Sequence, residues 1–161
     1  MITIKTVSLN PDEKTELERA LRKFAAKRET SFELLSSQVS MGADKLLLGY
    51  EGKRNIHFTR PRTFIDRYLP KLIIILPRNP TDFFYRFRLS IISTVVLALL
   101  VFGVVACIIS ASIGQSDVYA FLFPIILLCL FASGTLLEYK LSVLKIKRAL
   151  SKYQLTKHQL D

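Results

Sequence analysis

Basic residues gather between positions 53 and 71, and this is the part of the chain whose residue types could bind a ligand. Arg60 and Arg62 flank Pro61, a spacing that lets two guanidinium groups reach one phosphate. The predicted anion-binding set, suited to phosphate or a lipid headgroup, is Lys53, Arg54, His57, Arg60 and Arg62. The alternative is a solvated face of a sheet, on which these charges bind nothing in particular.

Catalysis and metal binding have weaker support in the sequence. His57 has no carboxylate or nucleophile at a recognisable spacing that would make it a general base, and Asp66 is expected to pair with an arginine. The sequence shows no glycine-rich phosphate loop, no paired acids, no Ser-His-Asp arrangement and no Cys/His metal spacing. Cys107 and Cys129 are interpreted as small packing residues. We therefore expect no catalytic residue, metal or cofactor.

Two long uncharged runs dominate the rest of the chain. Residues 89–113 and 118–137 contain no Lys, Arg, Asp, Glu or His. A helix needs about 20 apolar residues to cross a hydrocarbon core of about 30 Å. The alternative is a pair of helices buried in a soluble core, but a chain of 161 residues has too little material to cover two of them. The sequence predicts a transmembrane helical hairpin.

The distribution of charge predicts its orientation. Before the hairpin 17 basic residues oppose 10 acidic ones, after it six oppose two, and the loop carries only Asp117, for a net charge of +10. Positive residues stay on the cytoplasmic side, so both termini are expected there, at a cell membrane such as the bacterial inner membrane. A nucleic-acid partner would also suit the charge, but attraction to anionic lipid already accounts for it.

The first 78 residues have the patterns of an α+β domain, with one helix on a mostly antiparallel sheet. Asn10, Pro11 and two acids predict a helix from residue 11 to about residue 28. Residues 71–76 fit a strand buried on both faces, and residues 63–69 fit at most one helical turn. Further strands are predicted over residues 2–9, 31–40, 44–50 and 54–60, with a turn at 41–43.

The membrane helices are expected to extend beyond their apolar runs. Pro80 follows a good capping sequence, so the first helix is predicted to begin there. After the second run, a heptad pattern continues through Leu136, Tyr139, Val143, Ile146, Leu150 and Tyr153. This seam fits either docking on the N-terminal domain or a self-associating coiled coil. Pro124 is expected to kink the second helix or to mark its start.

Small residues in the first membrane helix predict a packing face. Gly103, Cys107 and Ala111 recur every four residues, a spacing that lets two helices approach closely. We favour packing against the second helix of the same hairpin over an oligomer interface. The predicted helix-packing set comprises Gly103, Cys107, Ala111, Leu136, Val143, Ile146 and Leu150.

Three parts follow from these patterns: a cytoplasmic α+β domain (1–78), a two-helix hairpin (79–137) and a basic C-terminal helix and tail (138–161). The leading hypothesis is a non-catalytic accessory, regulatory or scaffold protein of the membrane, with anionic lipid headgroups and a homo-oligomer or protein partner as its contacts. One alternative is an oligomeric effector that perturbs the membrane or forms a pore. Another is an enzyme or binding module for a phosphorylated lipid or nucleotide.

Overall fold

The computed structural model of the chain describes residues 2–29, 44–62, 65–113 and 118–158. The predicted strand at 31–40 and turn at 41–43 lie outside these residues. The elements are β1 (Thr3–Ser8), α1 (Pro11–Phe24), β2 (Ala25–Arg28), β3 (Leu47–Glu51), β4 (Asn55–Thr59), the 3-10 helix η1 (Ile65–Tyr68), β5 (Leu72–Pro77), β6 (Phe84–Leu89), α2 (Ile91–Ser112) and α3 (Val118–His158).

The strands of the described residues form one mixed sheet in the order β1-β6-β5-β4-β3-β2. Only β2 and β3 pair in parallel, and every other neighbouring pair is antiparallel. The predicted combination of a helix with a mostly antiparallel sheet is confirmed. β5 is buried along nearly its whole length, as its continuous apolar sequence predicts.

The helix α1 begins where the sequence predicts and ends earlier. The backbone N–H of Asn10 donates to Glu13 Oε2 at 2.9 Å, a bond that belongs to the capping box at the expected helix start. The predicted end near Arg28 is wrong, because α1 stops at Phe24 and the next four residues form β2. Pairing with β3 overrides the good helix propensity of Ala25–Arg28. Gly49 permits this pairing, since a Cβ there would lie 3.1 Å from that of Ala25.

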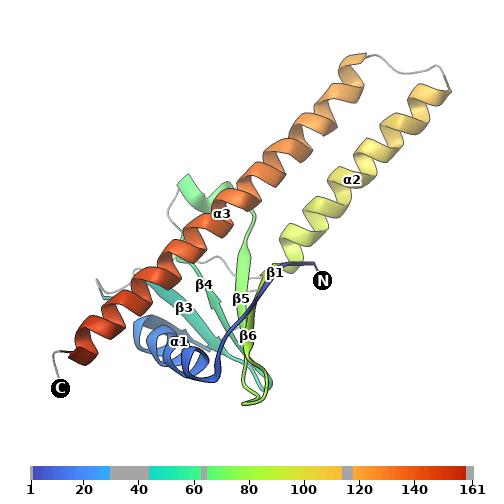
Figure 1. The fold of residues 1–161 in the computed structure, drawn as a ribbon. Coiled ribbons are helices and arrows are strands. Elements are labelled where there is room, and N and C mark those ends of the chain that lie inside the picture. Colours follow the sequence, from blue (N-terminus) through green and yellow to red (C-terminus); the bar gives the residue numbers. More distant parts are fainter. Residues whose placement is uncertain (1, 30–43, 63–64, 114–117, 159–161) are drawn as a thin grey trace.

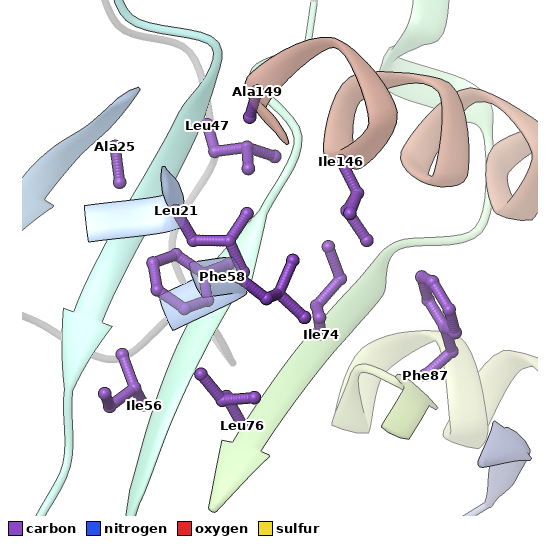
Figure 2. Close-up of a cluster of buried hydrophobic side chains, with 11 residues drawn as sticks. Leu21, Ala25, Leu47, Ile56, Phe58, Ile74, Leu76, Phe87, Ile146 and Ala149 are labelled. Carbon is purple, nitrogen blue, oxygen red and sulfur yellow. The ribbon is translucent and has the colours of Figure 1, made fainter. Parts of the chain in front are cut away.

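The core lies between one face of the sheet and two helices. Leu17 and Leu21 of α1 and Ile146 and Ala149 of α3 pack over the same strands, and Figure 2 shows Leu21, Ile146 and Ala149 within this cluster. Each of the four is at most 4% exposed. On the sheet, the buried side chains that meet them include Leu47, Ile56, Phe58, Ile74, Leu76 and Phe87. The C-terminal part of α3 is therefore a structural part of the domain.

The segment before the first long helix differs from the prediction. A helix beginning at Pro80 is wrong, because Phe84–Leu89 is the strand β6, which pairs with both β1 and β5. Tyr85 and Phe87 face the core side while Arg86 and Arg88 face the opposite side, which is the period of a strand. The sheet thus extends past residue 78, and Ser90 alone connects it to α2.

Two helices are long and apolar enough to cross a membrane. α2 has a mean hydropathy of 2.9 in its most apolar window and α3 has 1.9, and the side chains in these windows are mostly exposed. α2 matches the predicted run, while α3 continues from its apolar half through to His158 and contains Pro124 within it. In Figure 1 the two helices project together from one end of the sheet, and the remainder of α3 crosses the domain.

Candidate functional site

Glu138 lies where α3 passes from its apolar half to the sheet domain. It is the first charged residue after the apolar run that ends at Leu137. The residue is fully buried, whereas Leu136 and Leu137 beside it are 61% and 49% exposed. A buried carboxylate normally requires a positive partner, because desolvation of a charge is costly. Glu138 therefore marks a specific contact between α3 and the domain.

Arg60 supplies that contact and holds a second carboxylate as well. Its Nη2 donates to Glu138 Oε2 at 2.7 Å, and its Nη1 donates to Asp66 Oδ2 at 2.6 Å. Arg60 follows β4, Asp66 lies in η1, and Glu138 lies in α3, so one guanidinium group joins three elements. The predicted pairing of Asp66 with an arginine is confirmed.

Burial and charge act in opposite directions on the two arginines of this cluster. Burial alone would lower the pKa of Arg60, but its hydrogen bonds to Glu138 and Asp66 outweigh this and raise the pKa. The pKa of Arg62 is lowered, chiefly by burial, with Arg60 adding repulsion that the charges of Glu138 and Asp66 oppose. The guanidinium group of Arg60 therefore remains the positive partner of Glu138.

This geometry favours a structural ion-pair cluster that joins elements of the fold over an open anion-binding site. The side chain of Arg60 is 7% exposed and both of its terminal nitrogens are engaged by carboxylates. Among the described residues, Glu138 Oε1 and Arg60 Nε have no hydrogen-bond partner. A buried pair of this kind adds little net stability but is expensive to break from one side. The cluster therefore specifies how α3 sits on the sheet.

The structure separates the predicted anion-binding residues. Lys53 and Arg54 lie in the turn between β3 and β4, and Arg60 follows the other end of β4. The five residues of β4 span about 16 Å, so this turn and Arg60 lie at opposite ends of the strand. Arg60 and Arg62 lie together near Glu138 and Asp66, away from Lys53 and Arg54.

His57 lies in β4 opposite Tyr50 of β3 and Ile75 of β5. The imidazole meets the Tyr50 ring edge to face, with 6.0 Å between the ring centroids. Arg60 instead reaches α3, which covers the other face of the sheet. The histidine and Arg60 therefore do not share one site.

The predicted helix-packing residues fall into two groups. At Gly103 a Cβ would lie 3.8 Å from the Cβ of Pro124, so α2 approaches α3 closely there. Cys107 is partly buried and Ala111 is exposed. Tyr139, Val143, Ile146 and Leu150 pack against the domain core, whereas Leu136 is exposed. Within one chain, most residues of the heptad pattern therefore pack against the sheet domain.

A second set of hydrogen bonds joins the start of α2 to the residue before β5. The hydroxyl of Ser93 accepts a hydrogen bond from the Lys71 backbone N–H at 2.8 Å, and the Ser90 N–H donates to the Lys71 carbonyl at 2.9 Å. The Ser90 hydroxyl also caps α2 by accepting from the Ser93 N–H. Both long helices thus contact the chain at the ends of neighbouring strands, α2 at Lys71, the residue before β5, and α3 at Arg60, the residue after β4.

Several hydroxyl groups in the apolar helices bond to their own helix backbone. They are those of Thr94, Ser112, Ser133 and Thr135, each of which donates to a carbonyl three or four residues earlier. Such bonds satisfy a hydroxyl where no water is available. The hydroxyl donors of these four residues are therefore already paired within their own helices.

The role of Glu138 was missed at the level of sequence. The available signal is its place directly after an apolar run, where a lone acid precedes six basic residues. No groups of three His, Cys, Asp or Glu side chains able to hold a metal ion occur in the described part of the chain. Comparison of the chain with protein-family models, curated proteins and solved structures found no match.

Proposed function

We propose that this chain is a two-pass membrane protein in which α2 and the apolar half of α3 cross the bilayer. The sheet domain and both termini lie on the cytoplasmic side. The exposed apolar surface of the two helices supports this proposal, because so many uncovered Leu, Ile, Val and Phe side chains suit lipid better than water. The absence of basic residues between the helices, against their excess on both flanks, supports the orientation.

The role that we propose is a non-catalytic accessory, regulatory or scaffold subunit that holds its domain in a fixed position against the membrane. The observation that carries this is the continuity of α3. Its first half is apolar and exposed, whereas Ile146 and Ala149 in its second half are 4% and 0% exposed in the domain core. One uninterrupted helix therefore belongs to both parts, and Glu138 and Arg60 fix it at the boundary.

The proposed contacts of the domain are anionic headgroups and a protein partner, either another subunit or a second copy. The chain carries a net charge of +10, all of its excess on the proposed cytoplasmic side. Basic residues near an anionic membrane surface each contribute about 1 kcal/mol of attraction. The charge thus holds the domain close to the bilayer, where a membrane partner would meet it.

Topology is tested by labelling single cysteines with a membrane-impermeant maleimide. In a Cys107→Ala/Cys129→Ala background, Ser116→Cys should be labelled in intact cells, while Lys53→Cys and Lys157→Cys should be labelled only after lysis. Labelling of Lys53→Cys in intact cells would contradict the orientation. Extraction of the protein by alkaline carbonate would contradict membrane insertion itself.

The subunit role is tested by native mass spectrometry of the protein extracted from its own membranes into lipid nanodiscs. We expect a complex of fixed stoichiometry that contains more than one polypeptide chain. A second preparation of the Glu138→Ala variant should yield less of this complex, because the unpaired buried Arg60 destabilises the contact that holds the domain in place. A wild-type protein that is always a single chain would overturn the role.

A further inference from the structure

The connection between β4 and β5 contacts α3 on the apolar side of Glu138. A Cβ on Gly134 would lie 3.1 Å from Pro70 Cδ and 3.6 Å from Leu69 Cδ2. A glycine at this position is what allows the connection to lie directly on the helix backbone. Figure 1 shows the short helix η1 of this connection beside α3, at the end of the sheet from which the long helices project.

The position of Gly134 sets the depth of this contact. It precedes Glu138 by four residues, which is one helical turn or about 6 Å. The large exposed side chains of α3 around this level are apolar, and Leu130, Leu136 and Leu137 are 61%, 61% and 49% exposed. The connection thus reaches the level at which the apolar surface of α3 begins.

Tyr68 is an exposed residue of this connection, with 83% of its surface accessible. It ends η1 and directly precedes the two residues that contact Gly134. A tyrosine ring has an apolar body and a polar hydroxyl, and such rings favour the headgroup layer of a bilayer. Asp66 of η1 forms an ion pair with Arg60, and Arg60 also forms one with Glu138 of α3. These ion pairs therefore connect η1 to α3 as well, one helical turn closer to the domain than Gly134.

We infer that the described residues of the β4–β5 connection, 60–62 and 65–71, form a membrane-interface element whose partner is the headgroup layer of the lipid bilayer. The ring of Tyr68 lies in that layer, next to the point where α3 enters the hydrocarbon. The inference rests on the proposed two-pass topology and goes beyond it, because it assigns a third contact with the membrane, independent of the two spans. The sequence alone places this connection in the soluble domain.

The experiment uses the fact that the chain contains no Trp. A Tyr68→Trp variant has a single indole at an exposed position, where the larger ring needs no repacking. It is reconstituted into vesicles of phosphatidylethanolamine and phosphatidylglycerol that carry a nitroxide either near the headgroup or near the end of the acyl chain. We expect the shallow label to remove more than half of the emission, and the deep label to remove clearly less.

Two further single-Trp variants calibrate the measurement. Leu130→Trp lies about 10 Å deeper on α3 than Leu137 and should be quenched most by the deep label. Tyr153→Trp lies about 24 Å beyond Leu137 on the domain side and should respond to neither label. If Tyr68→Trp behaves like Tyr153→Trp while Leu130→Trp is quenched, the interface element is wrong and the two-pass topology stands. If Leu130→Trp is not quenched either, the proposed function fails with it.

Discussion

At the scale of single residues, the contact between Arg60 and Glu138 decides how the apolar and polar halves of the molecule meet. Both residues are buried, and they are separated by 78 positions in the sequence. The sequence predicts Arg60 to be part of an anion-binding site with an external ligand. Its actual partner could not be predicted, because pairing across the fold depends on how α3 lies on the sheet.

Removing one member of this pair should be more damaging than removing both. Glu138→Leu leaves the buried Arg60 with Asp66 alone, and we expect a loss of about 3–5 kcal/mol of stability. The double variant Arg60→Met/Glu138→Leu should recover most of that loss, because it leaves no unpaired charge. Thermal denaturation in detergent, followed by circular dichroism, measures both. Equal melting of the single and double variants would contradict the coupling.

Tyr85 gives the domain a dependence on alkaline pH. Burial raises the pKa of its phenol, and the charge of Tyr139 adds to this effect. A folded-state pKa above the unfolded one stabilises the fold at all pH values below the unfolded pKa, and this contribution is lost as pH rises through the folded pKa. Tyr85→Phe should therefore lose less thermal stability than wild type as the pH rises above 10.

At the scale of elements, the sequence predicts secondary structure best where the residue pattern is uniform and the whole element lies in one environment. β5 is a continuous apolar run that is buried, and α2 is an uncharged run of spanning length. Prediction failed at β2 and β6, where pairing with strands distant in sequence selects the conformation. The alternation of Tyr85 and Phe87 with Arg86 and Arg88 is the sign of β6 in the sequence, but the helix start at Pro80 is the stronger local signal.

The docking of α3 on the sheet can be weakened without touching its apolar half. Ile146→Ala removes a side chain that is 4% exposed and should cost about 2–5 kcal/mol through the cavity it leaves. Leu144→Ala, two residues earlier and 48% exposed, should change stability by less than about 0.5 kcal/mol. Amide hydrogen exchange over residues 140–157 should rise in the first variant only. A similar rise in both would show that the seam does not hold α3.

At the scale of the whole molecule, α3 fixes both the rotation and the height of the domain. One alanine inserted between Leu137 and Glu138 turns all later residues by about 100° relative to the apolar half. The contact of Arg60 with Glu138 and the approach of Gly103 to Pro124 then cannot both persist, and the melting temperature should fall. The same insertion between Thr156 and Lys157 lies beyond the docked residues and should leave melting unchanged. Wild-type melting of the first insertion variant would mean that the two halves of α3 are uncoupled.

Because α3 is continuous, a tilt of its apolar half would also move the domain that is packed on its C-terminal half. About 30 Å of helix lie between Glu138 and the last turn, and the core of the domain is packed on that arm. Helices that cross a bilayer tilt to match its thickness. A change in tilt of about 10° would swing the far end of the arm by about 5 Å, and the sheet would move with it. In the proposed two-pass arrangement, a small change in bilayer thickness would therefore become a displacement large enough to alter a contact made on the domain surface.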